Sequence, residues 1–365
     1  MQSSIPAYVE SLVREIRQVG ASGEGKFPVH TVFFGGGTPS LLSPAQAGEI
    51  LASIGQNFDL LPEAEISLEA NPGTVSLGSL QGYRDAGINR ISFGVQSFQN
   101  AELQFLERIH SSREAVEAFE FARSAGFENI NLDLIFGLPG QTIDRWANSL
   151  EQAVKLEPEH LSLYALTIEE GTPLHRLVKT GKVTPLDDDL SADMYQLAEE
   201  KLASAGYTHY EVSNWAADRD GKVKVCIHNL QYWLNLPYLG FGAGAHGCAA
   251  GHRYANVSDI AGYIRAMAMD PMKQFPFSNA VESSQAIDQC TAMNETLMLG
   301  LRLLEHGVSA KDFYQRFGLK IEEVYAKQVE KLITQGLLEW AREQSILRLT
   351  KRGHLLGNLV FQEFV

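Results

Sequence analysis

Short apolar runs alternate with stretches of helical period through the first half of the chain. Each apolar run is too short for a typical helix and ends in polar or glycine-containing residues, as a strand entering a loop does. Strands are predicted at 29–34, 65–69, 90–95, 130–136 and 160–168. Helices are predicted at 6–20, 43–55, 76–86, 100–107, 112–125 and 142–155. This alternation predicts a parallel sheet covered by helices.

The strand–helix units are too few for a closed eight-stranded barrel, so we expect a partial, open one. A parallel barrel normally begins with a strand, whereas this chain begins with the helix at 6–20. The predicted fold class is therefore α/β: a partial parallel barrel of the six-stranded (β/α)6 type that lacks its first strand.

The second half of the chain is patterned differently. A helix is predicted at 190–205, and residues 207–262 are rich in glycine and aromatic residues without a clear period. Three helices, a hairpin and a last helix, similar to a winged-helix unit, are predicted at 288–304, 309–317, 320–335, 337–349 and 351–363. We expect three domains: the barrel at 1–206, a connecting region at 207–282 and a winged-helix-like domain at 283–365.

Composition excludes several classes of function. The 365 residues carry a net charge of −14, which disfavours binding to nucleic-acid phosphates and to anionic membranes. No stretch suits a membrane span or a secretory signal. Cys226, Cys248 and Cys290 lack the spacing of a cluster or zinc motif, so we interpret them as buried structural thiols. Sparse, unpaired cysteines also predict a reducing, cytoplasmic location.

A glycine-rich corner follows the first predicted strand. Gly35, Gly36 and Gly37 precede Thr38 there. Three consecutive glycines lose much backbone entropy on folding, which an ordinary turn does not require. The alternative is a tight exit from a buried strand. We favour backbone contact with a polar ligand, because the carboxyl ends of parallel strands meet at one ligand-binding edge.

Isolated polar residues mark the other strands. Glu69 follows an apolar strand, where it suits ribose hydroxyls or, alternatively, open solvent. Gln96 and Asp133 interrupt apolar strands, so each needs a partner, either a ligand or a neighbouring loop. Arg108 suits bidentate binding of a carboxylate. Its alternative is a helix-surface ion pair with Glu102, Glu107 or Glu114.

An imidazole lies close to two aromatic residues at His228, Tyr232 and Trp233. Such a histidine can ligate iron or stack on a flat macrocycle, although a solitary histidine more often satisfies a loop. A further glycine-rich strand is expected at 240–247, with His246 at its tip, either closing a ligand site or packing tightly on a neighbour. Tyr164, on the last barrel strand, could point into the barrel, but we interpret it as a core residue.

Four motifs follow one another in a recognisable order. They are Gly-Gly-Gly-Thr-Pro-Ser at 35–40, Glu-Ala-Asn-Pro-Gly-Thr at 69–74, Gly-Val-Gln-Ser-Phe at 94–98 and Asn-Leu-Asp-Leu-Ile-Phe-Gly-Leu-Pro-Gly at 131–140. With them the chain resembles the radical S-adenosylmethionine (SAM) enzymes of the oxygen-independent coproporphyrinogen oxidase family. Within that family, His-Asn-x-x-Tyr-Trp at 228–233 is similar to the signature of the haem-binding HemW branch.

The resemblance implies two sites. The SAM site would consist of Gly36, Gly37 and Thr38 at the methionine end, Glu69, Gln96 and Asp133 at the ribose and amino groups, and Arg108 at the carboxylate. The haem site would consist of His228, as the candidate iron ligand, with Tyr232 and Trp233.

One departure from the family concerns its cysteines. The family carries Cys-x-x-x-Cys-x-x-Cys after its first strand, where three thiolates bind a [4Fe–4S] cluster. None of the three cysteines in this chain has that spacing. Either the start was placed too late and an upstream strand exists, or the chain is a natural cluster-free relative. The retained SAM-type corners favour the first explanation.

The function implied is that of a haem chaperone with no assigned catalytic residue. It would bind haem in the cytoplasm and deliver it to respiratory proteins, with SAM and a [4Fe–4S] cluster in the intact form. Nucleic acid is not an expected partner, and any membrane association would come through protein partners. The alternatives are an oxygen-independent coproporphyrinogen III dehydrogenase and a cluster-free scaffold that binds haem or SAM.

Overall fold

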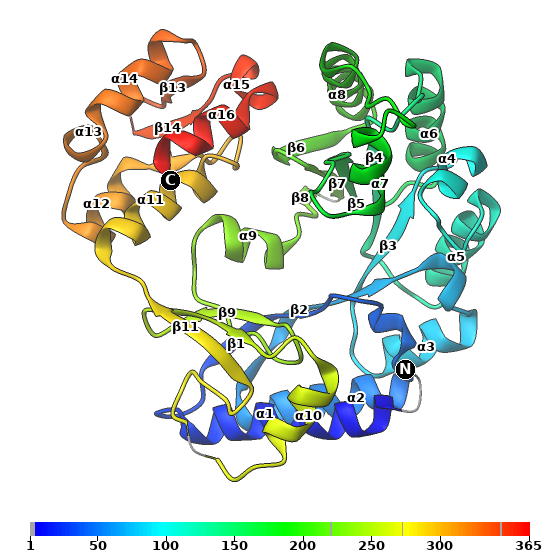
Figure 1. The fold of residues 1–365 in the computed structure, drawn as a ribbon, viewed down its shortest axis with the longest axis vertical. Coiled ribbons are helices and arrows are strands. Elements are labelled where there is room, and N and C mark those ends of the chain that lie inside the picture. The colour runs from blue at the N-terminus through cyan, green and yellow to red at the C-terminus, as the bar shows by residue number, and fades with distance from the viewer. Residues whose placement is uncertain (1–3, 220, 272, 344) are drawn as a thin grey trace.

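Five parallel strands form the central sheet of the computed structural model, which describes residues 4–219, 221–271, 273–343 and 345–365. In sheet order they are β1 (Pro28–Phe34), β2 (Asp59–Ala70), β3 (Arg90–Gln96), β4 (Ile130–Phe136) and β5 (His160–Ala165). The helices that precede and join them are α1 (Ile5–Ser22), α2 (Pro44–Asn57), α3 (Leu77–Asp85), α4 (Asn100–Phe105), α5 (Ser112–Ser124) and α6 (Ile143–Lys155). Figure 1 shows the sheet curved, with these helices on its outer side. The parallel pairing confirms the partial α/β barrel predicted from the sequence.

Two strand boundaries differ from the prediction. β2 begins at Asp59, six residues before the predicted start at 65. The register against β1 shifts between Val29 and Thr31, so that the segment around Pro62 is left out of the pairing and shows no regular alternation. β5 ends at Ala165 and not at 168, because the residues that follow lead out of the sheet toward α7 (Pro173–Lys179).

The sheet continues with antiparallel strands that the sequence pattern did not predict. β7 (Asn214–Arg219) pairs with β5, β6 (Tyr207–Glu211) pairs with β7, and β8 (Lys222–Val223) extends β7. The predicted helix at 190–205 is present as α8 (Asp188–Ser204). Because β6 and β7 are short and bury consecutive residues, they lack the polar–apolar alternation that identifies a half-exposed strand.

The next segment forms a helix and a second, three-stranded antiparallel sheet. Its elements are α9 (Ile227–Trp233), β9 (His246–Ala249), β10 (His252–Asn256), α10 (Ile260–Met267) and β11 (Val281–Ala286). The prediction of a glycine-rich strand at 240–247 was wrong: residues 240–245 form a loop, and His246 begins β9. Gly242 and Gly244 have φ values of 102° and 69°, and these left-handed conformations do not fit a strand.

The C-terminal segment forms a helical unit with its own buried core. It consists of α11 (Gln289–Gly300), β12 (Val308–Ser309), α12 (Ala310–Phe317), α13 (Ile321–Val324), α14 (Ala326–Thr334), β13 (Leu338–Ala341), β14 (Ile346–Leu349), α15 (Lys351–Leu355) and α16 (Gly357–Phe361). The helices and the β13–β14 hairpin confirm the predicted helical domain, although the helices expected at 320–335 and 351–363 are each broken near the middle. Leu297, Leu301 and Leu304 lie in its core.

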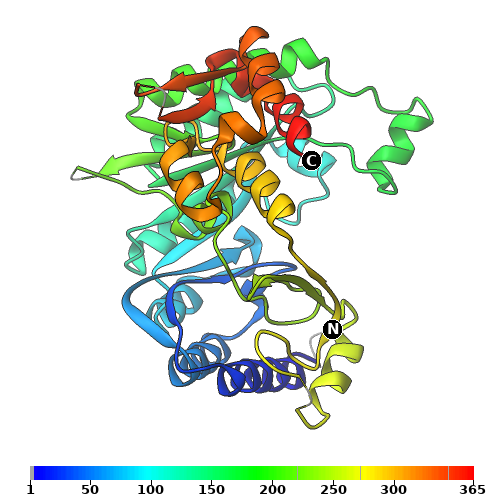
Figure 2. The same ribbon diagram turned by 90° about the vertical axis from the view of Figure 1, so that its left-hand side faces the viewer.

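The C-terminal helices and the first helices lie at opposite ends of the molecule, as Figure 2 shows. The domain boundaries expected from the sequence stay predictions. β6 and β7, which belong to the connecting region expected at 207–282, join the same sheet as β1 to β5. Among the described residues, no helix is both long and apolar enough to cross a membrane.

A buried carboxylate attaches α1 to the segment that carries the second sheet. Glu15 is 1% exposed, and its two oxygens accept four hydrogen bonds. The donors are the Gly242 amide at 2.7 Å, the Asn256 amide group at 2.8 Å, the Tyr263 hydroxyl at 2.7 Å and the Ser278 hydroxyl at 2.6 Å. The apolar stripe of α1 packs on α2, while Glu15, together with Tyr8, Arg14 and Gln18, attaches another side of the helix to the segment 242–279.

Candidate functional site

The parallel strands separate apolar and polar side chains onto two faces. Leu68, Phe93 and Leu132 are fully buried under the outer helices. Because alternate residues of a strand point to opposite faces, the polar residues all face the inside of the curve. Pairing places them side by side: Glu69 lies opposite Ser92, Ser92 opposite Asn131 and Asn131 opposite His160. The inner face is thus a continuous polar surface that leads to the carboxyl ends of the strands.

A cavity of about 220 Å³ opens at those carboxyl ends. Six of the seven residues predicted for the SAM site line it: Gly37, Thr38, Glu69, Gln96, Arg108 and Asp133. The seventh, Gly36, is attached to the same site, because its amide donates to Glu69 Oε2 at 3.2 Å. The structure therefore brings together, in one cavity, residues that are spread over about a hundred positions of sequence.

The sequence reasoning missed five residues that line this cavity: Pro39, Ala70, Asn71, Ser92 and Gly94. Ser92 and Gly94 precede Gln96 at intervals of two, so strand alternation would have placed all three on one face. Pro39, Ala70 and Asn71 belong to the corner motifs but carry no charge that would have singled them out.

The glycine-rich corner borders open space. Gly36 and Gly37 have φ values of 78° and 64°, a conformation that residues with a side chain rarely adopt. A Cβ atom built on either glycine would meet nothing within 4 Å. The backbone conformation, and not crowding by the protein, therefore requires glycine here, and the adjacent space is free for a ligand.

Gln96 is held in a strained conformation at the end of β3. Its φ is 68°, although it is not a glycine, and the pairing of β3 with β4 shifts register between Phe93 and Gln96. Such a conformation costs on the order of 1 kcal/mol and is typical of ligand-binding sites. The strain turns the last residue of the strand, with its amide side chain, toward the cavity.

Two carboxylates face the cavity together. Asp133 accepts hydrogen bonds from Asn131 at 2.8 Å and from Ser92 at 3.2 Å, and Glu69 accepts one from the Gly36 amide. Burial raises the pKa of both carboxyl groups, and the negative charge of Asp133 raises the pKa of Glu69 further. Because the negative charges of the two carboxylates repel each other, a positively charged ligand between them would favour the ionised form of both.

Arg108 is the cation of the cavity. Its side chain is exposed, and among the described residues it forms no ion pair with Glu102, Glu107 or Glu114, so the alternative expected from the sequence is not seen. Glu102 is instead hydrogen-bonded by Ser97 and Gln141. Burial lowers the pKa of Arg108, while the nearby Asp133 raises it. A guanidinium without a protein partner suits a ligand carboxylate.

His228 lies on α9, which Figure 1 shows inside the curve of the barrel. Its ring stacks on Phe33 with centroids 4.8 Å apart. Nδ1 lies 3.0 Å from the Thr31 hydroxyl and Nε2 lies 3.0 Å from the Tyr232 hydroxyl. Both ring nitrogens are therefore engaged by the protein, and an iron atom at Nε2 would have to displace Tyr232.

The two aromatic residues predicted beside His228 lie on different sides of α9. Tyr232, four residues on, meets His228 edge to face with ring centroids 5.0 Å apart. Trp233, one residue further, turns away, and its ring packs against the Arg302 guanidinium at 4.3 Å. Helical spacing explains the difference, because residues four apart share a face and residues five apart do not.

The ionisation of His228 should make stability depend on pH. Burial, together with the charges of Arg90 and His30, lowers the pKa of His228 to about 4 from 6.5. As the pH falls from 6.5 toward 4, the unfolded chain takes up this proton before the folded chain does, so stability is lost, by about 2 to 3 kcal/mol in total. Urea unfolding of the wild type and His228→Gln across this range measures the difference. The exposed His306→Gln serves as control, and parallel curves for wild type and His228→Gln would contradict the assignment.

A hydrogen-bonded chain joins the cavity to the start of α9. Asn131, which donates to Asp133, also lies 2.6 Å from His160 Nδ1, and His160 Nε2 lies 2.8 Å from the Tyr210 hydroxyl. The Cys226 amide, at the N-cap of α9, donates to the same hydroxyl at 3.4 Å. Neither His160 nor Tyr210 was singled out from the sequence: Tyr210 lies on the unpredicted strand β6, and His160 is the first residue of the predicted strand at 160–168.

Two other sequence interpretations need correction. Tyr164 is not a core residue, since it is 42% exposed near the end of β5, on the same inner face as Ser162. The thiols are not all buried either: Cys226 is buried, but Cys248 is half-buried and Cys290 is exposed in the first turn of α11. No three thiols gather within the part of the chain that the structure describes.

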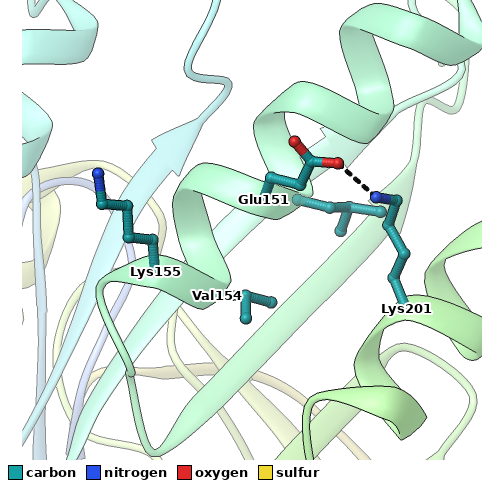
Figure 3. A pocket seen from close by; sticks show the side chains of 5 residues that line it. Glu151, Val154, Lys155 and Lys201 are labelled. Carbon is teal, nitrogen blue, oxygen red and sulfur yellow. Dashed lines mark hydrogen bonds and ion pairs between the residues drawn. The ribbon is translucent and has the colours of Figure 1, made fainter.

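A second cavity, of about 240 Å³, lies between α6 and α8. Figure 3 shows Glu151, Val154 and Lys155 on α6, with Lys201 reaching Glu151 from α8. That ion pair, at 2.5 Å, occupies two of the three charged groups in the lining, and the remaining residues are Lys155 and the apolar Leu150 and Val154. None of the residues predicted for a ligand lies there.

Two family models match parts of the chain. Residues 3–153 match the Radical SAM superfamily, and residues 287–356 match the HemN C-terminal domain. The chain is 36% identical to the "Heme chaperone HemW" of Bacillus subtilis, covering 99% of this chain and 92% of that protein. It is also 36% identical to the "Heme chaperone HemW" of Escherichia coli, covering 98% and 89%.

Solved structures agree at the level of the fold. The coproporphyrinogen III oxidase HemN of Escherichia coli, described as a radical SAM enzyme, superimposes with a TM-score of 0.80. The match covers 100% of this chain and 84% of that one, at 22% sequence identity. The shared architecture therefore includes the barrel, the connecting region and the C-terminal helices.

Proposed function

The chain belongs to the heme chaperone HemW family of radical SAM proteins, and on that basis we propose that it binds haem and delivers it to other proteins. The observation that carries the proposal is the similarity to HemW proteins over 99% of the chain, from the barrel through the C-terminal helices. The acceptors we expect are respiratory haem proteins, and the compartment we expect is the cytoplasm.

The cavity at the strand ends fits SAM by its chemistry. Its two carboxylates, Glu69 and Asp133, suit the positively charged end and the ribose hydroxyls of SAM, and Arg108 suits its carboxylate. The open corner at Gly36 and Gly37 leaves backbone amides accessible to the methionine end. When bound, SAM supplies an adenosyl group on a sulfonium centre. The residues of this chain bind and orient that molecule, with Gln96 turned toward it by the strained end of β3.

The [4Fe–4S] cluster that the radical SAM family implies does not fit the cysteines of this chain. Cys226 lies at the start of α9, Cys248 on β9 and Cys290 on α11. Cys226 is buried, and burial raises its pKa to about 11, which disfavours the thiolate that a cluster requires. We therefore derive no chemical step through a cluster, and the proposed function rests on binding alone.

His228 is the residue we propose for contact with haem. It is neutral at physiological pH, as an iron ligand must be, and it lies on the inner side of the barrel with Phe33 on one face. Binding of iron at Nε2 requires the Tyr232 hydroxyl to leave, so Tyr232 would act as a gate. Trp233, held against Arg302, would stay in place behind the helix.

Titration of haem into the full chain, followed by the Soret absorbance, tests the proposal. We expect wild type to bind one haem, His228→Ala to bind about tenfold more weakly with a shifted Soret band, and the control His306→Ala to match wild type. Equal binding by wild type and His228→Ala would remove His228 from the site while leaving the function intact.

Transfer is the second part of the test. Haem-loaded protein is mixed with a haem-free respiratory cytochrome, and the appearance of its characteristic spectrum is followed. Absence of haem binding by the wild type, or a transfer no faster than that of free haem, would contradict the chaperone function. Oxidation of coproporphyrinogen III would point to the dehydrogenase instead, which the 22% identity to HemN does not by itself favour.

A further inference from the structure

Three side chains that could bind a metal meet where the C-terminal helices touch the barrel. Glu199 comes from α8, His209 from β6 and His354 from α15. Glu199 Oε1 lies 3.2 Å from His209 Nδ1 and 3.2 Å from His354 Nδ1. One ligand atom from each of the three lies within 4.8 Å of the others. No residue of the SAM or haem sites takes part.

The hydrogen bonds of the His209 ring make the contact between its Nδ1 and Glu199 unfavourable for a neutral imidazole. His209 Nε2 lies 3.3 Å from the Val212 carbonyl and 3.3 Å from the Tyr195 hydroxyl, which itself donates to the same carbonyl at 2.8 Å. Since both neighbours are acceptors toward the ring, Nε2 carries the proton. In a neutral imidazole Nδ1 is then a bare acceptor, and it faces the carboxylate of Glu199. Two acceptors in contact require either a second proton or a cation between them.

The surroundings hold these groups as a metal site would. The His209 ring stacks on Trp215 at 3.9 Å, and Trp215 is fully buried, so the direction of Nδ1 is fixed. Donation of the second ring N–H to a backbone carbonyl is the usual arrangement of a metal-binding histidine. Among the described residues, no lysine or arginine pairs with Glu199, so its charge is met by the imidazoles alone.

We propose that Glu199, His209 and His354 bind a divalent transition-metal ion of the Zn²⁺ class. Two imidazoles and one carboxylate are a common zinc ligand set, with water in the fourth position. Ligands at about 2.0 Å from a tetrahedral zinc lie about 3.3 Å apart, close to the 3.2 Å found here. The side chains of His209, His354 and Glu199 are 14%, 15% and 31% exposed, which leaves a path for the ion and a place for the water.

The proposed ion would fasten the C-terminal unit to the barrel. α15 follows the β13–β14 hairpin, whereas α8 and β6 belong to the barrel side, so a bond to all three restrains their relative position. Ion binding to the folded chain alone stabilises it by mass action. The role is structural and is independent of the proposed haem and SAM binding.

Zinc binding to the full chain, stripped with a chelator, tests the proposal. Competition with a chromogenic chelator gives the affinity, and Co²⁺ replaces Zn²⁺ for its visible absorption bands. We expect one equivalent to bind the wild type, and His354→Ala and Glu199→Gln each to weaken binding by about 100-fold or more. The control His306→Ala removes an exposed imidazole of the same unit and should bind as wild type does.

Thermal unfolding distinguishes the two explanations of the contact between Glu199 and His209, a bound metal ion and a second proton on His209. With a metal site, added Zn²⁺ raises the melting temperature of wild type and His306→Ala but not of His354→Ala. If Zn²⁺ affinity and melting temperature are the same in wild type, Glu199→Gln and His354→Ala, the cluster holds no metal. A doubly protonated His209, seen by nitrogen NMR in zinc-saturated wild type, would overturn the proposal in the same way.

Discussion

Replacement of Glu15 by leucine is expected to lower the free energy of unfolding by about 4 kcal/mol. The variant removes an acceptor from four donors. The Asn256 amide group also donates to the Gly242 carbonyl at 3.0 Å, and the Ser278 hydroxyl still accepts from the Ala280 amide at 3.1 Å. Among the described residues, the Gly242 amide, the Tyr263 hydroxyl and the Ser278 hydroxyl then have no acceptor for their protons, at a cost of about 1 to 3 kcal/mol each. Leucine has a similar volume, so packing alone accounts for little of the loss.

Urea unfolding of Glu15→Leu, Glu15→Gln and Glu10→Gln measures this effect. The glutamine at position 15 keeps one acceptor oxygen, so its loss should be about half that of leucine. Glu10 lies on the exposed side of α1 and pairs only with Arg14, so its variant should change stability by less than about 0.5 kcal/mol. A loss below 1 kcal/mol for Glu15→Leu would mean that the four hydrogen bonds contribute little to stability.

Replacement of Arg108 by alanine is expected to weaken SAM binding by about 30-fold, equivalent to roughly 2 kcal/mol. The guanidinium lines the cavity and forms no ion pair among the described residues, so its loss leaves the fold unchanged and removes only the partner of the SAM carboxylate. A hydrogen-bonded charge pair of this kind accounts for an effect of that size.

Calorimetry with two ligands isolates the role of Arg108. SAM carries the carboxylate, whereas 5′-methylthioadenosine has the same nucleoside without the amino-acid end. Arg108→Ala should lose affinity for SAM and keep its affinity for methylthioadenosine, and Arg113→Ala, an exposed arginine on α5, should change neither. An equal loss for both ligands would place Arg108 at the nucleoside, contrary to the assignment.

The parallel part of the fold was predictable because its strands separate residue types so cleanly. The runs at 29–34, 90–95 and 130–136 became β1, β3 and β4 with boundaries within one residue. Polar residues at fixed intervals in such strands, Gln96 and Asp133 above all, have no reason to be there unless a ligand or a network needs them. That is why the predicted residues share one cavity.

The antiparallel part was not predictable for the opposite reason. β6 and β7 are short and bury consecutive residues, so their sequences show no clear alternation, and their pairing depends on residues far away in the chain. His228 was singled out correctly as unusual, but the sequence could not reveal that Thr31 and Tyr232 occupy both its nitrogens. The residues Glu199, His209 and His354 come from three separate elements, so no motif with a fixed spacing predicts their cluster from the sequence.

The hydrogen bonds of Glu15 determine when α1 can become fixed during synthesis of the chain. All four of its donors lie between residues 242 and 278, so α1 emerges more than two hundred residues ahead of its partners. Until then the Glu15 carboxylate has only water to bind, although the apolar stripe of α1 can already pack on α2. α1 is therefore fully fixed only after residues 242–278 have been made, because contacts between segments so far apart in the chain form late in folding.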